Sequence, residues 1–152
     1  MLSKLKVLFL CTGNSCRSQI AEGWARHLHG ETVEPYSAGT RPGRVDPRAI
    51  EVMREVGVDL AGHRSKHLDE VVDVGLDWVV TVCDHANESC PVFPGDVRRM
   101  HVGFDDPPRL ASAANSDDEA LGHYRRVRDE IREFVETLSG RLERAGTDGA
   151  TR

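Results

Sequence analysis

The chain has 152 residues, of which 39% are hydrophobic, 30% charged and 5% aromatic, which suits one water-soluble globular domain and excludes a membrane-spanning protein. Its 20 Lys and Arg residues against 25 Asp and Glu give a formal charge of −5, which argues against nonspecific nucleic-acid binding. The apolar run after Lys4 and Lys6 is too short for the core of a signal peptide. We therefore expect a cytoplasmic protein with no nucleic-acid or membrane partner.

The first part of the chain predicts a strand, a helix, a second strand and a second helix. Residues 6–10 are a continuous apolar run that ends at a turn, as a strand buried on both faces does. From Ser18 apolar residues recur at helical spacing, and residues 33–37 are expected to form the next strand. Asp46 followed by Pro47 is typical of a helix start, because a cap residue precedes a proline at the first helical position.

The second part continues this alternation. Ser65 is expected to cap a short helix, after which residues 76–82 and 98–104 are predicted to be the third and fourth strands. Residues 107–118, rich in Ala, Ser, Asp and Pro, predict a mobile loop. A clear 3.6-residue apolar period over residues 121–142 predicts the last helix.

Alternating strands and helices predict an α/β fold with right-handed crossovers. We expect a single domain over residues 1–145, with a four-stranded parallel sheet in flavodoxin-like order and helices on both faces. The chain shows neither an internal repeat nor a linker. Residues 146–152 are expected to be a disordered tail.

Four cysteines carry the first functional signal: Cys11, Cys16, Cys83 and Cys90. In a cytosolic protein, several thiols indicate metal binding or catalysis rather than structural disulfides. The spacings, with four and six intervening residues, differ from those of paired zinc knuckles, so no metal site is expected.

Cys11 and Cys83 each follow a predicted strand. In open α/β sheets, ligands bind outside the carboxyl ends of the strands. If the first and third strands are neighbours, their ends lie about 5 Å apart. The two thiols would then be close in space, although they are far apart in the sequence.

The loop after Cys11 has the composition of an oxyanion cradle. Its backbone N–H groups can surround a tetrahedral anion, Gly13 permits the tight turn, and the next helix adds its positive end. Arg17 offers a planar fork for two oxygens, and Ser18 can donate to the Cys11 sulfur. Cys16 is expected to pack under the loop without redox chemistry. The predicted oxyanion-binding residues are Thr12, Gly13, Asn14, Ser15, Cys16 and Arg17.

The chain resembles the thioredoxin-coupled arsenate reductases, which are built on the low-molecular-weight tyrosine phosphatase fold. The resemblance is carried by the segments CTGNSCRSQIAEGW, YSAG, VVTVCDHANESCP, GFDDP and RVRDEI, and it extends from Lys6 to about Leu142. The phosphatase loop is common to both groups of enzymes. The second cysteine pair favours the reductases.

The resemblance implies a three-thiol relay. Cys11 attacks arsenate, and Asp106, rather than its neighbour Asp105, protonates the leaving oxygen. Cys83 then attacks Cys11 and releases arsenite, and Cys90 attacks Cys83. The resulting Cys83–Cys90 disulfide is reduced by thioredoxin, which thioredoxin reductase and NADPH regenerate. The family resemblance further implies a monomer without a bound cofactor, and we expect residues 83–93 to change conformation on oxidation.

Some members of the family bind a potassium ion. Residues that match Asn14, Glu22 and Ser37 do so there together with an aspartate. The position of that aspartate is Lys66 in this chain. The chain departs here from the family pattern, so we expect the Lys66 ammonium to occupy the charge role of the ion and the protein to show no potassium dependence.

Two other functions remain open from the sequence. A tyrosine or small-molecule phosphatase would use the same Cys11, Arg17 and Asp106, and we expect weak phosphatase activity. However, the segment after Gly39 lacks the aromatic residues that bind phosphotyrosine. The second cysteine pair would also have no role in a phosphatase. A thiol redox sensor or an arsenite-binding module would need neither the arginine nor the aspartate. A mycothiol or glutaredoxin system also remains open as the reductant.

Overall fold

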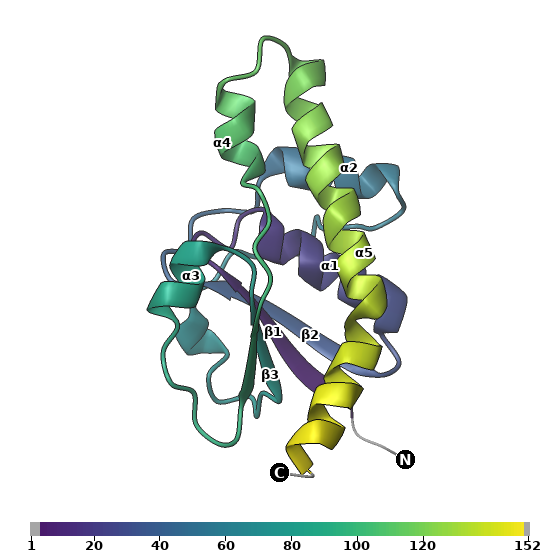
Figure 1. Cartoon of the computed structure of the whole chain (residues 1–152). Coiled ribbons are helices and arrows are strands. Elements are labelled where there is room, and N and C mark those ends of the chain that lie inside the picture. The colour runs from purple at the N-terminus through teal and green to yellow at the C-terminus, as the bar shows by residue number, and fades with distance from the viewer. Residues whose placement is uncertain (1–3, 151–152) are drawn as a thin grey trace.

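The structure, a computed structural model, describes residues 4–150, without the side chains at positions 85, 87, 89 and 143–150. It contains one four-stranded sheet in the order β2-β1-β3-β4, and every strand pair is parallel (Figure 1). The strands are β1 (Leu5–Cys11), β2 (Val33–Gly39), β3 (Trp78–Thr81) and β4 (Arg98–His101). The predicted α/β domain with flavodoxin-like strand order is confirmed.

Strand β1 is central, which explains its unbroken apolar sequence. Residues 7–10 are completely buried, because helices and loops cover both faces of the sheet. In the sheet register, Cys11 lies opposite Gly39 of β2, and Leu10 lies opposite Thr81 of β3. The carboxyl ends of three strands therefore meet around Cys11.

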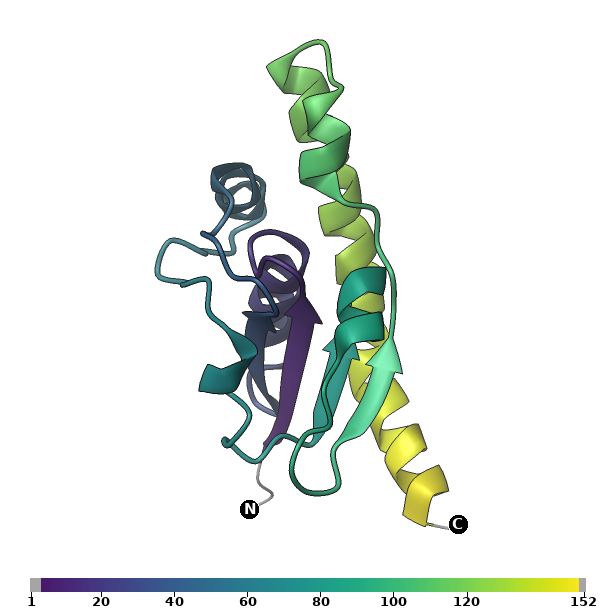
Figure 2. The same cartoon turned by 90° about the vertical axis from the view of Figure 1, so that its left-hand side faces the viewer.

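Two long helices cover one face of the sheet. Helix α1 (Arg17–His29) packs against α5 (Asp117–Ala150), which runs along the length of the molecule (Figures 1 and 2). Trp24 of α1 is 1% exposed and donates its indole N–H to the Arg128 carbonyl of α5 at 3.1 Å. No helix within residues 4–150 is long and apolar enough to span a bilayer.

The shorter elements surround the carboxyl edge of the sheet. Helix α2 begins after Asp46, whose side chain accepts from Arg48 N as the Asp-Pro signal predicts. The remaining elements are α2 (Pro47–Glu55), the 3₁₀ turn η1 (Leu68–Glu70), α3 (Asp84–Ser89) and α4 (Pro107–Ser112).

The predicted cap at Ser65 is wrong. The chain at residues 66–67 runs extended beside the end of β2, where Gly39 N donates to Lys66 O at 2.9 Å. The helical turn therefore starts later, and His67 caps η1. Ser65 instead donates to the carbonyl of Gly13 at 2.9 Å.

The prediction of a loop over residues 107–118 is wrong for the first part of this segment, which forms helix α4. Two prolines occupy its first turn, where the N–H groups that they lack are not needed for hydrogen bonds within the helix. Ala111 is buried because α4 packs against α5. Helix α5 is assigned from Asp117 to Ala150. The last two residues of the predicted tail, 151–152, lie outside the described residues.

Candidate active site

The loop between β1 and α1 is held by its carbonyl groups. Four of them accept hydrogen bonds: Thr12 O from Arg41 N (2.8 Å), Gly13 O from Gly43 N (3.2 Å), Asn14 O from Gln19 Nε2 (3.1 Å) and Ser15 O from Asp46 N (2.9 Å). The N–H groups of residues 13–16 have no acceptor in the part of the chain that the structure describes. Amides arranged in this way can bind a tetrahedral oxyanion, with the positive end of α1 beside them.

The tight turn of this loop lies at Asn14. This residue has a φ of 47°, a left-handed conformation that asparagine adopts more readily than most residues. Gly13, at which the sequence predicts the turn, is not among the described residues with positive φ. A glycine is needed at Gly39, where an added Cβ would lie 2.4 Å from the Thr12 carbonyl oxygen.

The Cys11 sulfur lies 2.9 Å from Ser18 Oγ, and both residues are buried. The backbone N–H of Lys66 can only donate, so Asn14 accepts it with Oδ1 at 3.0 Å and directs Nδ2 at Ser18 Oγ, 2.8 Å away. Ser18 therefore accepts from Asn14 and gives its own hydrogen to Cys11. A donor at this sulfur stabilises the thiolate, which is the nucleophilic form.

Gln19 and His63 hold this network from behind. Gln19 Nε2 donates to Asn14 Oδ1 at 3.0 Å, and its Oε1 lies 2.8 Å from His63 Nδ1. His63 thus carries its hydrogen on Nδ1 and accepts from Arg26 at Nε2, 3.2 Å away. Burial lowers the pKa of His63, which favours this neutral form.

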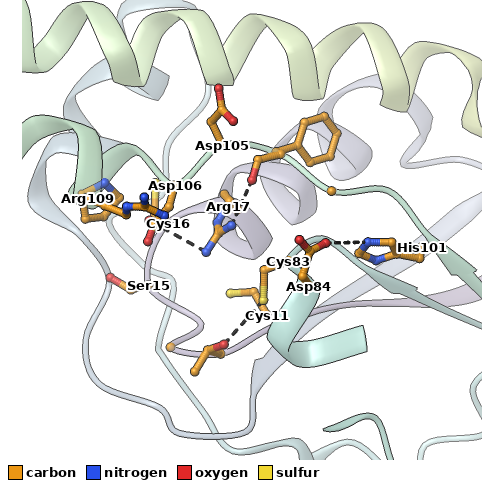
Figure 3. Close-up of a pocket in the computed structure, with 15 residues that line it drawn as sticks. Cys11, Ser15, Cys16, Arg17, Cys83, Asp84, His101, Asp105, Asp106 and Arg109 are labelled. Carbon is orange, nitrogen blue, oxygen red and sulfur yellow. Dashed lines mark hydrogen bonds and ion pairs between the residues drawn. The ribbon is translucent and has the colours of Figure 1, made fainter. Parts of the chain in front are cut away.

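Arg17 and Asp106 lie together above the loop. Arg17 Nη1 donates to the Phe104 carbonyl at 3.0 Å, and its Nη2 lies 3.8 Å from Asp106 Oδ1. Asp105 forms an ion pair with Arg126 of α5 at 3.1 Å. Of the two adjacent aspartates, Asp106 is therefore the one beside the arginine, and Asp105 points toward α5 (Figure 3).

The pairing of strands in the sheet places Cys83, the second thiol, beside the loop that follows Cys11. Val82 N donates to Leu10 O at 2.9 Å, which sets the start of α3 beside the loop. Cys83 Sγ lies 3.5 Å from Thr12 Oγ1 and accepts from Ala86 N at 3.4 Å. Cys90 follows α3 at its other end and is partly exposed.

These groups share one cavity of ≈ 1030 Å³ (Figure 3). Its lining includes Cys11, Arg17, Cys83 and Asp106, which come from three separate segments of the chain. Cys90 is not part of this lining. The cavity thus joins a thiol, an oxyanion cradle, a cation and an acid, and a second thiol lies within it.

The chain matches known proteins over most of its length. Residues 6–147 match the model of the low molecular weight phosphotyrosine protein phosphatase family. The arsenate reductase of Halalkalibacterium halodurans is 43% identical over 138 residues, which cover 91% of this chain and 97% of that protein. The chain belongs to this family and its arsenate reductases.

Two solved structures extend the family comparison. An arsenate reductase in its phosphate-binding state matches with a TM-score of 0.67 and 32% identity, covering 91% of this chain and 98% of the other. The thioredoxin-dependent arsenate reductase of Corynebacterium glutamicum matches with a TM-score of 0.70 and 25% identity, covering 95% of this chain and 64% of the other.

Lys66 lies beside two of the residues at which the family resemblance implied a potassium ion, Ser37 and Glu22. Lys66 Nζ donates to the Ser37 carbonyl at 3.0 Å, and Ser37 Oγ donates to Glu22 Oε1 at 2.5 Å. Glu22 is also paired with Arg26 at 2.7 Å. Because the Arg26 guanidinium already pairs with this carboxylate and the Lys66 ammonium already occupies the Ser37 carbonyl, these residues do not fit a potassium ion.

Cys16 differs from the other thiols of the cavity. Burial raises the pKa of its thiol well above the ordinary value, and the nearby Asp46 carboxylate acts in the same direction. Cys16 therefore stays protonated at neutral pH, which suits a packing role under the loop.

Three residues without an assigned role in the sequence analysis also shape the site: Gln19, Gly39 and His101. Gly39 closes the YSAG segment at a strand end, and His101 ends the fourth strand at the edge that carries both thiols, so position alone could have indicated them. Gln19 carries no such signal, because its partners come from distant segments.

Proposed function

We propose that this protein reduces arsenate to arsenite by a relay of Cys11, Cys83 and Cys90, with thioredoxin as the reductant. The observation that carries the proposal is the position of Cys83, whose sulfur reaches Thr12 in the loop of the nucleophile. A phosphatase has no use for this second thiol or for Cys90.

In the first step the Cys11 thiolate attacks arsenic within the cradle. The amides of residues 13–16 and the Arg17 guanidinium stabilise the charge on the arsenate oxygens. Asp106 gives its proton to the departing oxygen, which leaves as water, and a Cys11–arsenic bond forms. Arg17 Nη2, 3.8 Å from the Asp106 carboxylate, keeps both groups on the same side of the cavity.

In the second step the Cys83 thiolate attacks the Cys11 sulfur. A sulfur–sulfur bond forms as the sulfur–arsenic bond breaks, and the electron pair of that bond stays on arsenic. Arsenic is thereby reduced from As(V) to As(III) and leaves as arsenite, while the two thiols are oxidised to a disulfide.

In the third step Cys90 attacks Cys83 and frees Cys11. Cys83 and Cys90 flank the six-residue helix α3. At about 1.5 Å of rise per residue, their Cα atoms are roughly 10 Å apart along the helix axis. A disulfide requires a separation below about 7 Å. Helix α3 must therefore unwind or contract in this step.

Thioredoxin then reduces the Cys83–Cys90 disulfide. This choice of reductant is supported by the partial exposure of Cys90 and by the likeness to a thioredoxin-dependent reductase. We place the protein in the cytoplasm, because thiols that cycle in this way need a reducing compartment. The monomeric state is proposed on the family resemblance alone.

The test is arsenate-dependent NADPH consumption with thioredoxin and thioredoxin reductase. We expect continuous turnover by the parent, about one equivalent of arsenite from Cys90→Ser, and none from Cys83→Ser. Continuous turnover by Cys90→Ser would show that another thiol or another reductant, and not Cys90, resolves the Cys11–Cys83 disulfide. A parent that is inactive with arsenate but hydrolyses a phosphate monoester would make the phosphatase function the correct one.

A further inference from the structure

His101 lies beside the thiols without a role in the relay. It ends β4 and lines the same cavity as Cys11 and Cys83. Its ring makes two contacts. Nδ1 lies 2.8 Å from Thr81 Oγ1. Nε2 lies 3.0 Å from Asp84 Oδ1, a contact that Figure 3 shows. His101 thus joins the last residue of β3 to the first residue of α3, on either side of Cys83.

The hydrogen between His101 and Asp84 can be assigned. The Asp84 carboxylate only accepts hydrogen bonds, so His101 donates to it from Nε2. Nδ1 lies on the other side of the ring, 2.8 Å from Thr81 Oγ1, and the Thr81 hydroxyl also has the Met100 carbonyl at 3.5 Å as an acceptor.

The contacts of His101 with Thr81 and Asp84 lie where the backbone hydrogen bonds that hold this segment end. Up to Val82 the chain is held by neighbouring strands, since Val82 N donates to Leu10 O and Val82 O accepts from Phe104 N at 3.3 Å. Beyond that point Asp84 leads into α3. Its contact with His101 favours one direction in which the chain leaves the sheet, and with it one direction of the Cys83 sulfur.

The contact with Asp84 is also weak enough to break. The Asp84 side chain is 87% exposed, so water competes for it and screens the charge. Such a contact can bias the position of a segment without locking it. This matters because α3 has to open when Cys90 attacks.

We propose that His101 is a positioning residue, which holds Asp84 so that Cys83 faces Cys11 and lets it go when α3 opens. The proposal rests on the thiol relay proposed above. It assigns His101 no contact with arsenate, so binding and the first step should not depend on it.

The test measures arsenite release in single turnover as arsenate concentration is varied. It uses Cys90→Ser as the parent, so that the reaction stops at the Cys11–Cys83 disulfide. We expect His101→Ala and Asp84→Ala each to lower the maximal rate about fivefold, as the loss of an exposed contact does, without changing the half-saturating arsenate concentration. Because both remove the same contact, the double variant should be no slower than either one.

Two amide substitutions provide a matched pair. The Gln amide in His101→Gln corresponds to Nε2 and should keep the contact with Asp84 and most of the rate. The shorter Asn in His101→Asn corresponds to Nδ1 and should behave like Ala. A merely structural role would not separate these variants in rate while their thermal midpoints stay equal.

Three results would overturn the role of His101: an unchanged maximal rate in His101→Ala, multiplying effects in the double variant, or equal rates in the Gln and Asn variants. In each of these the parent still releases arsenite, so the relay itself stands. A parent that releases no arsenite would overturn the relay and the role of His101 with it.

Discussion

Among single residues, Ser18 has the most defined task, because both of its hydrogen-bonding partners are fixed. It accepts from Asn14 and donates to Cys11. Ser18→Ala removes a bond to a charged sulfur that is worth about 1.5–3 kcal/mol. We therefore expect the rate of arsenate reduction to fall about 10- to 100-fold.

The same substitution leaves the Asn14 amide without an acceptor, so the thermal midpoint should fall as well. Ser139→Ala, on α5 and outside the lining of the cavity, is the matched control and should change neither quantity. A Ser18→Ala enzyme with the parent's rate would show that the thiolate does not depend on this donor.

His63 gives a prediction about pH. Burial lowers its pKa in the folded protein, so the unfolded chain takes up the proton first as pH falls below the ordinary value of 6.5. The stability that this histidine contributes is complete above pH 6.5 and is lost as pH falls toward the folded pKa.

Thermal midpoints measured from pH 7.5 to 5.5 would test this. The parent should lose more stability over this range than His63→Gln, which keeps polar groups near Gln19 but takes up no proton. Equal slopes for the two proteins would contradict the prediction.

At the scale of elements, the loop depends on the end of β2. Gly39→Ala would place a Cβ 2.4 Å from the Thr12 carbonyl oxygen, so the loop or the strand must shift. A misplacement of about 1 Å in an active site costs on the order of 100-fold in rate, and we expect a loss of that size.

Gly122→Ala is the matched glycine control for this experiment. Gly122 lies within α5, and an added Cβ there meets nothing within 4 Å. Alanine should leave activity unchanged and stabilise the helix by about 1 kcal/mol. Retained activity in Gly39→Ala would mean that the cradle tolerates displacement.

Helix α3 should report the redox state. Since a Cys83–Cys90 disulfide cannot span an intact six-residue helix, amide hydrogen exchange at residues 84–89 should be faster in the oxidised protein. Helix α1, which the disulfide does not touch, should exchange equally in both forms. Identical exchange at residues 84–89 would rule out this rearrangement.

For the molecule as a whole, the position of the Lys66 ammonium predicts that thermal stability does not depend on potassium. It already donates to the Ser37 carbonyl, and Glu22 is already paired. The thermal midpoint in potassium chloride should equal that in sodium chloride at the same ionic strength. A marked gain in potassium would show that the ion still binds.

Local signals predicted much of this architecture. The buried run of β1 and the Asp46–Pro47 helix start depend on a few neighbouring residues, and both are found. The roles of Ser65 and Asn14 could not be predicted in this way. Ser65 is set by the Gly13 carbonyl, 52 residues away in the chain, and the left-handed turn at Asn14 is supported by Lys66 at the same separation.

The predicted site residues also differ in how far the sequence could place them. Residues 11–18 are contiguous, so their proximity follows from one strand, one loop and one helix. The meeting of Cys83 with this loop depended on the first and third strands being neighbours, as in the expected flavodoxin-like order, and the sheet has this order. Helix α4 was missed because two prolines and several small polar residues resemble a loop until α5 covers Ala111.

The contact between the Cys83 sulfur and Ala86 N would impose an order on the steps of the proposed relay. This sulfur is the N-cap of α3, and loss of such a cap typically costs a helix about 1 kcal/mol. A thiolate is a better acceptor than a disulfide sulfur, so bonding to Cys11 weakens the cap at the moment arsenite leaves. A six-residue helix has little intrinsic stability to replace it. In the proposed relay, the second step would thus loosen the helix that the third step must open, and Cys90 would be kept at a distance until arsenic has been reduced.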